Sequence, residues 1–172
     1  RVPEPSPRLG ASVGGIDPSP PNIEIARLHA ERSGATVDYR ATTAEDLVET
    51  GTRFDVVLAL EVVEHVADLD LFLKACAELL KPGGIAFFAT LNLTMKAFAL
   101  AIVGAEYILR WLPPGTHQWS KFVTPDELAR SITGGGLQLS DETGIVYDAF
   151  ADVWKRPPDM DVNYMMAAIR RS

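Results

Sequence analysis

The chain has 172 residues, 47% of them hydrophobic, and a formal net charge of −7. This length suggests one domain, and the hydrophobic fraction is sufficient for a real core. The acidic balance argues against a nucleic-acid partner, because phosphate binding needs a basic face. The single cysteine, Cys76, excludes an internal disulfide and favours a reducing compartment. We see no signal peptide and no apolar run of the roughly 20 residues that a membrane span needs.

Strands and helices are expected to alternate along most of the chain. Apolar and β-branched runs predict strands, and apolar residues at helical spacing with glycine stops predict helices. The expected strands are 11–17, 36–40, 54–60 and 85–92, and the expected helices are 20–34, 43–51 (a turn or short helix), 67–84 and 124–136.

The strands at 54–60 and 85–92 are continuously apolar, so we expect both to be fully buried. Alternating strands and helices of this kind predict a parallel sheet covered on both faces. The tail differs, because residues 137–148 and 162–171 resemble two strands with no long helix between them. We therefore expect an α/β domain whose mostly parallel sheet is closed by an antiparallel hairpin.

The opening unit of a doubly wound domain is missing from this pattern. Such a domain normally begins with a strand, a glycine-rich turn and a helix that hold the ligand. Here residues 1–7 contain three prolines, and Gly14-Gly15 lies inside a strand-like segment rather than a G-x-G-x-x-G loop. Either the unit does not exist or the sequence joins across a segment that contains it. We favour the second, since a sheet without its central strand exposes a large apolar edge.

Acids follow two of the predicted strands. Asp17 can accept hydrogen bonds from both ribose hydroxyls of a nucleotide, or it can cap the next helix. Asp46, beside Glu45, can accept from an adenine amino group, or it can belong to the acid-rich first turn of a helix. Position alone leaves both alternatives open for each acid.

The strand expected at 54–60 is followed directly by two glutamates and a histidine in LEVVEHV, residues 60–66. Acidic residues at the end of a buried strand need an explanation. In a helix or turn, Glu61, Glu64 and His65 share one face at i, i+3 and i+4. Two carboxylates and an imidazole suit Mg²⁺ or another divalent ion. Alternatively, His65 is a general base held by one carboxylate, or all three have only surface roles. The carboxyl ends of strands in open sheets bind ligands, which favours a site.

Ala97–Leu112 is apolar except for Glu106 and Arg110, with Trp111 and Trp119 nearby. As a helix it would span only about 24 Å, too short for a comfortable membrane crossing. Aromatic and basic residues around an apolar stretch are typical of interfacial helices. A buried helix over the mouth of the active site is the alternative, and the two are compatible.

The order and spacing of GIDPS, AEDL, FDVVLALEVVEHV and LKPGG resemble class I S-adenosylmethionine-dependent methyltransferases. EVVEHV, the block Thr90–Phe122 and VNYM resemble, more narrowly, the ubiquinone-biosynthesis O-methyltransferase family. The similarity runs from about Leu9 to Ile169. It implies a Rossmann-like class I methyltransferase sheet with an antiparallel last strand. It also implies one domain over 1–172, with a helical lid or membrane-facing insertion at about 94–123.

The resemblance also implies roles for individual residues. Asp17 would bind the ribose of S-adenosylmethionine, Leu60 would lie against the cofactor, and Asp46 would lie near its adenine. The positions ascribed to catalysis and to a divalent cation, Mg²⁺ above all, match Glu61, Glu64 and His65. The family's D-x-G-C-G-G-type loop, expected before the strand that carries Asp17, is absent from this sequence.

The implied substrates are 2-polyprenyl-6-hydroxyphenol and 3-demethylubiquinol. The protein would then be cytoplasmic and peripherally bound to the inner face of a membrane through Ala97–Leu112, where other ubiquinone-biosynthesis proteins are candidate partners. Three alternatives stay open. They are a methyltransferase for another small phenol or acid, a nucleotide-binding oxidoreductase, and a membrane-docked scaffold without catalysis.

Overall fold

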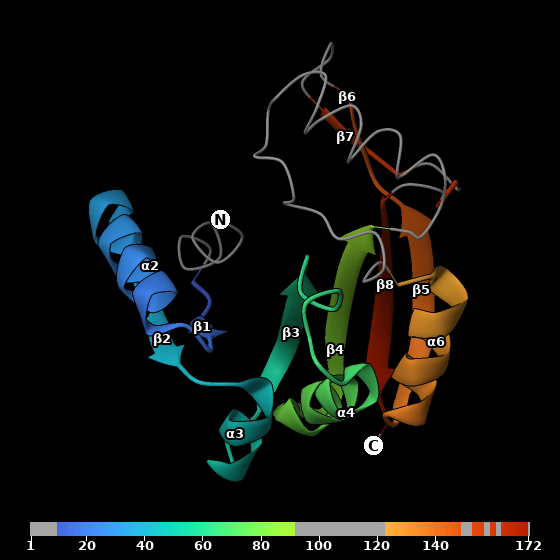
Figure 1. Cartoon of the computed structure of the whole chain (residues 1–172), viewed down its shortest axis with the longest axis horizontal. Coiled ribbons are helices and arrows are strands. Elements are labelled where there is room, and N and C mark those ends of the chain that lie inside the picture. The colour runs from blue at the N-terminus through green and yellow to red at the C-terminus, as the bar shows by residue number, and fades with distance from the viewer. Residues whose placement is uncertain (1–9, 92–122, 149–152, 157–158, 161–162, 172) are drawn as a thin grey trace. The chain divides into compact units, whose positions relative to one another are not determined.

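The computed structural model describes residues 10–91, 123–148, 153–156, 159–160 and 163–171 (Figure 1). They belong to two compact units, Arg1–Thr52 and Arg53–Ser172. Apart from Val123, the predicted insertion at 94–123 lies outside the described residues, and so does Ala97–Leu112. No helix within the described ranges is long and apolar enough to cross a membrane.

The first unit is a strand–helix–strand–helix arrangement (Figure 1). Strands β1 and β2 pair in parallel, as the sequence predicted. The first helix has a proline in its first turn and ends before Gly34, whose φ of 68° is the left-handed conformation that glycine favours. The elements are β1 (Gly14–Asp17), α2 (Pro20–Ser33), β2 (Asp38–Ala41) and α3 (Ala44–Glu49).

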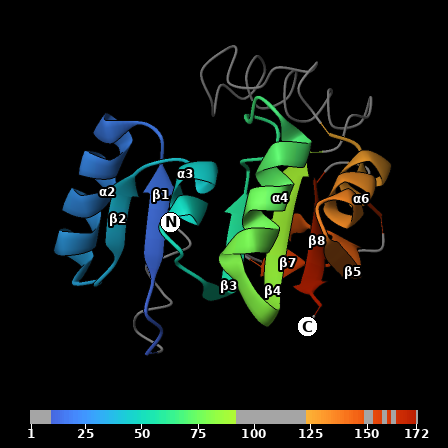
Figure 2. The same cartoon turned by 90° about the horizontal axis from the view of Figure 1, so that it is seen from below.

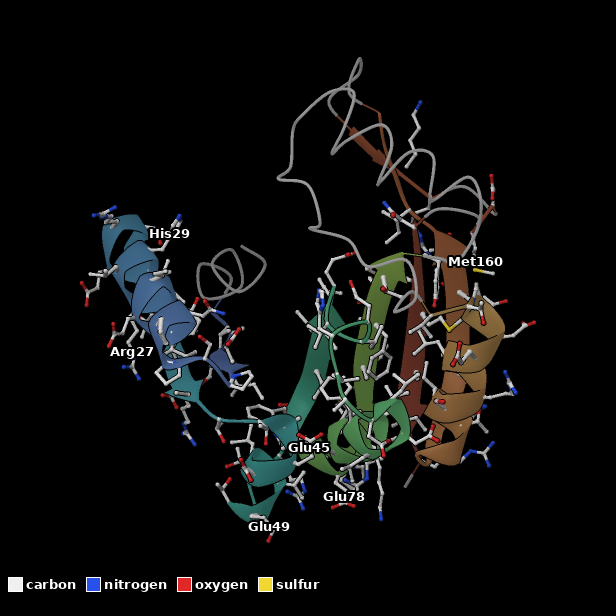
Figure 3. The ribbon with its side chains drawn as sticks, in the orientation of Figure 1. Arg27, His29, Glu45, Glu49, Glu78 and Met160 are labelled. Atoms are coloured by element: carbon white, nitrogen blue, oxygen red, sulfur yellow. The ribbon has the colours of Figure 1, made fainter. Side chains whose placement is uncertain are left out.

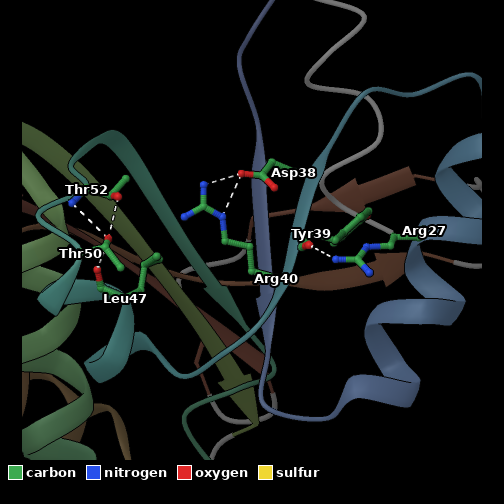
Figure 4. Close-up of polar contacts among 7 residues, drawn as sticks. All are labelled: Arg27, Asp38, Tyr39, Arg40, Leu47, Thr50 and Thr52. Atoms are coloured by element: carbon green, nitrogen blue, oxygen red, sulfur yellow. Dashed lines mark hydrogen bonds and ion pairs between the residues drawn. The ribbon is translucent and has the colours of Figure 1, made fainter.

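Polar contacts of the first unit lie both between elements and within them (Figure 4). Arg27 Nη2 of α2 donates to the carbonyl oxygen of Tyr39 in β2 at 2.6 Å. A Cβ at Gly15 would lie 2.5 Å from the Tyr39 ring, so only glycine lets this ring lie on β1. Thr50 Oγ1 donates to the carbonyl oxygen of Leu47 at 2.7 Å and so closes the end of α3.

The second unit is built on a four-stranded sheet with the order β3-β4-β8-β5. Strand β3 is parallel to β4, whereas β8 is antiparallel to both β4 and β5, so the last strand alone runs the opposite way. Strands β6 and β7 form a separate antiparallel pair. The elements are β3 (Phe54–Leu60), α4 (Leu69–Leu79), β4 (Leu80–Leu91), α6 (Pro125–Gly134), β5 (Leu137–Gly144), β6 (Val146–Asp148), β7 (Val153–Lys155) and β8 (Asn163–Arg170).

Helices α4 and α6 lie side by side over one face of this sheet (Figure 2). Alternate residues of β8 are buried, as expected for a strand with one covered face. Asp68 and Thr124 cap the two helices by accepting from the backbone N–H groups of Leu71 and Glu127. The largest fully buried side chains are Tyr164, Phe88, Leu73, Leu80, Leu128, Ile132, Met166, Thr90 and Cys76.

Arg170, the last residue of β8, forms hydrogen bonds with the end of α4. Its Nη1 donates to the carbonyl oxygens of Ala77, Glu78 and Leu80 at 3.0, 3.0 and 2.6 Å. The last carbonyls of a helix have no partner within it, and they carry partial negative charge. A guanidinium at this place therefore satisfies them and complements the helix dipole.

The expectation that 54–60 is fully buried was wrong. Val56 and Leu58 keep 48% and 47% of their surface exposed, because these alternate residues lie on the face of β3 opposite to buried Ala59. An apolar run shows that a segment favours burial, not which neighbours it has. Among the described residues, β1 and β2 form one sheet, and β3, β4, β8 and β5 form another.

Candidate functional site

The chain turns sharply where β3 ends. Glu61 adopts a φ of 55°, the one positive φ outside glycine in the described residues. Its N–H donates to the carbonyl oxygen of Ala89 in β4 at 2.8 Å, which fixes this conformation against the neighbouring strand. A left-handed backbone costs a residue with a side chain roughly 1–2 kcal/mol, and such strain collects at functional sites.

The turn after Glu61 sends one acid into the protein. Val63 is 2% exposed and anchors the turn in the core, while Glu64 beside it is 7% exposed. Thr90 Oγ1, on β4, donates to Glu64 Oε2 at 2.7 Å. A buried carboxylate is costly without such a partner, and this short charge-assisted hydrogen bond offsets part of the cost.

Glu61 and Glu64 form an interacting pair of carboxyl groups. Burial first, and then the charge of Glu64 and a hydrogen bond to it, raise the pKa of Glu61 to about 7. Two carboxyl groups this close titrate as a pair rather than singly. Near neutral pH the pair can therefore release or accept one proton, which is the property that a general acid or base needs.

The predicted metal site of Glu61, Glu64 and His65 is not formed in the described residues. No three His, Cys, Asp or Glu side chains there come together in a way that could hold a metal ion. The reason is local: residues 61–66 form a turn closed by the His65 N–H on the carbonyl oxygen of Val62 at 2.8 Å, not a helix. Glu64 therefore points inward and His65 stays exposed. The donor types suit a hard cation, whereas their arrangement does not.

Asp17 stands at the carboxyl end of β1, as predicted. It is not the cap of α2, because that place belongs to Ser19. Asp17 Oδ1 accepts from the Ser19 N–H at 2.8 Å, and Asn22 Nδ2 donates to Oδ1 at 3.2 Å and to Oδ2 at 3.3 Å. A carboxylate has about four acceptor sites, so these three contacts leave about one site, on Oδ2, for a ribose hydroxyl.

Asp46 lies in the first turn of α3. It is exposed, and its backbone N–H donates to the side chain of the N-cap residue Thr43 at 3.1 Å. Glu45 and Glu49 extend from the same short helix (Figure 3). Acids in a first turn complement the helix dipole, so the structural alternative explains Asp46 without any ligand.

The predicted residues divide between the two units. Asp17 and Asp46 belong to the first, whereas half-buried Leu60 ends β3 in the second, directly before Glu61. The structure brings Glu61 and Glu64 together and separates His65 from them.

Two residues of the site were missed in the sequence. Thr90 was read as part of an apolar strand, and Tyr164 as part of the last strand. They lie directly opposite each other on β4 and β8, and Tyr164 Oη donates to the carbonyl oxygen of Val123 at 2.9 Å. Burial, and after it the charges of Glu127 and Glu64, raise the pKa of the Tyr164 hydroxyl. The available signal was a hydroxyl at the carboxyl end of an otherwise apolar strand.

Comparison with known proteins identifies the family. A family model described as a methyltransferase domain matches residues 2–88. The chain is 59% identical over 167 residues to the ubiquinone biosynthesis O-methyltransferase of Brucella anthropi, covering 97% of the chain and 67% of that relative. The chain belongs to the ubiquinone biosynthesis O-methyltransferase family.

Other members of the family give the same result. The chain is 61% identical to the relative in Chelativorans sp. (strain BNC1), with 96% of the chain and 65% of that relative covered. For the relative in Mesorhizobium japonicum, the identity is 57%, with 98% and 68% covered. The chain thus spans about two thirds of the length of these curated relatives.

Solved structures confirm the fold class. N-methyltransferase NodS from Bradyrhizobium japonicum, in complex with S-adenosyl-L-homocysteine, matches with a TM-score of 0.60 at 15% identity, covering 94% of this chain and 67% of that one. The [4+2]-cyclase SpnF matches with a TM-score of 0.68 at 16% identity, covering 98% and 70%. Because the cyclase is named for a different reaction, this likeness supports the Rossmann-like methyltransferase fold and not a particular chemistry.

Proposed function

We propose that this protein transfers the methyl group of S-adenosylmethionine to a phenolic oxygen in ubiquinone biosynthesis. The observation that carries the proposal is the identity of 56% to 61% with relatives named ubiquinone biosynthesis O-methyltransferase. The finer proposal, from the motif resemblance, is that the acceptors are 2-polyprenyl-6-hydroxyphenol and 3-demethylubiquinol. Both present a phenolic hydroxyl beside a second oxygen.

A phenol needs help to react, because its pKa is about 10 and the neutral hydroxyl is a weak nucleophile. S-adenosylmethionine, when bound, supplies an electrophilic methyl group on a sulfonium sulfur. The carboxylate of Glu61 accepts the phenolic proton while the oxygen takes the methyl group and the carbon–sulfur bond breaks. Its pKa of about 7 suits a base that works near neutral pH. Exposed His65, on the same turn, is the alternative proton acceptor.

Each unit is proposed to contribute its own cofactor contact. In the first unit, Asp17 keeps about one acceptor site for a ribose hydroxyl. In the second unit, half-buried Leu60 offers apolar surface beside Glu61. Asp46 is the weakest of the three candidates, because its helix position already explains it.

The divalent cation stays a prediction. Glu61 and Glu64 supply oxygen ligands of the kind that Mg²⁺ prefers, without a third ligand from His65 in the described residues. An assay in excess chelator decides the question. A loss of activity that Mg²⁺ restores would establish the cation, and full activity would leave proton transfer to Glu61 or His65 without a cation.

Association with a membrane surface is proposed for Ala97–Leu112. The support is its sequence, an apolar stretch with tryptophans and basic residues close by. A polyprenyl substrate is confined to the bilayer, so an enzyme that docks there meets it directly. Co-sedimentation with liposomes at low salt is the expected result, and protein that remains in the supernatant would contradict the proposal.

The function itself is tested by a methyl-transfer assay with a panel of acceptors. Prenylated catechols should gain one methyl group, detected by mass spectrometry, and should react faster than soluble catechols. Equal rates would indicate an enzyme for small phenols. No transfer to any acceptor, from folded protein that binds cofactor, would favour the scaffold alternative.

A further inference from the structure

Glu64 is a buried carboxylate that contacts the sheet from a turn. Its partner, Thr90, lies 26 residues away in the chain, and the hydrogen bond between Thr90 Oγ1 and Glu64 Oε2 measures 2.7 Å. Glu64 is 7% exposed and Thr90 is fully buried. A hydrogen bond between two groups that water does not reach is well suited to fix an orientation, since no solvent competes for either partner.

Thr90 is itself held on a rigid element. Its strand, β4, is paired on one side with β3 through Leu60 and Ala89, and on the other with β8 through Thr90 and Tyr164. Tyr164, directly opposite, is fully buried. A β-branched side chain has few χ1 choices, so the Thr90 hydroxyl is presented at a defined point of the sheet.

Glu61 depends on where the carboxylate of Glu64 lies. The two carboxyl groups interact by charge and by a hydrogen bond. Glu61 also has a fixed backbone, with a φ of 55° and its N–H on the carbonyl oxygen of Ala89. Thr90 therefore holds the Glu64 carboxylate in place, and the charge of that carboxylate acts on Glu61.

We propose that Thr90 is a positioning residue for methyl transfer, whose hydroxyl fixes the Glu64 carboxylate and through it the Glu61 carboxyl group at the end of β3. This inference rests on the proposed function. Thr90 touches no reacting atom, and no bond to it forms or breaks. A purely structural role would instead make Thr90 matter for folding and not for turnover.

The test compares two variants in the intact protein. Thr90→Val keeps the shape and removes the hydroxyl, whereas Thr90→Ser keeps the hydroxyl. We expect Thr90→Val to lower kcat for a catechol acceptor roughly 10- to 100-fold, the usual cost of losing a group that orients a functional side chain. Thr90→Ser should stay within about threefold, and binding of S-adenosylhomocysteine should not change in either. Unchanged kcat in Thr90→Val would overturn the proposal.

A double variant shows whether Thr90 acts through Glu64. Groups that act as a unit have non-additive effects. Adding Thr90→Val to Glu64→Gln should therefore cost less than about threefold beyond Glu64→Gln alone. Multiplied losses would mean that Thr90 acts elsewhere and would contradict the inference. Should Thr90→Val fail to fold, Thr90→Ala serves in its place.

A readout without turnover separates this inference from the proposed function. In protein labelled with ¹³C at glutamate carboxyl groups, the Glu64 resonance is assigned by its loss in Glu64→Gln. Thr90→Val should shift this resonance and Thr90→Ser should not. If the wild type methylates no catechol, the proposed function fails, and this spectrum still decides the contact: a shift supports the positioning by Thr90, and an unmoved resonance overturns it.

Discussion

The two units differ in how many large apolar side chains each one buries in its own core. In the described residues, four apolar side chains are buried in the first unit: Ile23, Ala30, Ala44 and Leu47. All of the largest fully buried side chains belong to the second unit. Buried apolar area is the main source of stability, so the second unit is expected to supply most of it. The first unit, which carries Asp17, has the smaller set of buried apolar side chains among the described residues.

The largest expected effect comes from the core of the second unit. Phe88→Ala should lower the free energy of unfolding by about 3–5 kcal/mol, because a fully buried aromatic side chain is lost and a cavity remains. Ile23→Ala is the matched change in the first unit. It should speed amide exchange in residues 10–52 and leave β4 and β8 protected. Urea unfolding measures the first change and hydrogen exchange the second. An equal loss of protection in the two units of Ile23→Ala would contradict the difference between their cores.

Loss of the Arg170 hydrogen bonds at the end of α4 should lower the free energy of unfolding by less than Phe88→Ala does. Arg170→Met removes three hydrogen bonds from a charged group and should cost about 1.5–3 kcal/mol of unfolding free energy. Arg171→Met is the control, since exposed Arg171 donates only to the side chain of Gln138 at 2.9 Å in the described contacts. The unfolding free energy of Arg171→Met should stay within about 0.5 kcal/mol of the wild type. Equal losses in the two variants, measured by chemical denaturation, would show that the Arg170 contacts do not stabilise the protein.

Much of this architecture could be predicted from the sequence, because local patterns determine it. Proline and glycine bounded α2, the apolar run marked β3 as a strand, and the absence of a helix between the last two strands predicted their antiparallel pairing. The prediction that failed concerned packing between segments distant in the chain. The exposure of Val56 and Leu58 depends on what packs against their face of β3, and an apolar run does not contain that information.

In the site, too, local features could be predicted from the sequence and non-local contacts could not. Glu61 and Glu64 were found because acids are conspicuous at the end of an apolar strand. Their grouping with His65 into a metal site is not found in the described residues, because the turn after β3 buries Glu64 and leaves His65 exposed. Thr90 was missed because its significance lies in a contact 26 residues away, and no local pattern distinguishes it from an ordinary strand threonine.

The first unit is tested through Asp17. Asp17→Ala should weaken cofactor binding by roughly 1–3 kcal/mol, because hydroxyls buried in the complex lose their acceptor. Asn22→Ala controls for the local structure, since it removes the side-chain contact to Asp17 and leaves the carboxylate. Calorimetric titration of both variants measures the difference. Equal affinity for the wild type and Asp17→Ala would assign Asp17 to the turn alone.

The smallest expected effect is a dependence of stability on pH at Glu61. Its pKa in the folded protein, about 7, lies above the ordinary value of 4.5. The folded state therefore binds the proton more tightly, so the contribution of Glu61 to stability is complete below about pH 4.5 and is lost as the pH rises through 7. Allowing for solvent screening, the change amounts to about 1 kcal/mol.

Glu61→Gln should flatten the unfolding free energy between pH 5 and pH 8, measured by urea titration at each pH. An unchanged pH profile would show that Glu61 is not the titrating group. For the wild type we expect the rate of methyl transfer to rise on passing pH 7, and Glu61→Gln should lose this rise.

Calorimetric titration of S-adenosylhomocysteine into the intact protein tests the proposed cofactor binding, on which methyl transfer depends, most directly, because no assumption about the acceptor, the cation or the membrane enters. The account predicts saturable binding of one ligand per chain, accompanied by slower amide exchange in residues 10–52, the weakly cored unit that carries Asp17. A folded sample that shows no binding would contradict it and would leave the non-catalytic scaffold as the better explanation of this sequence.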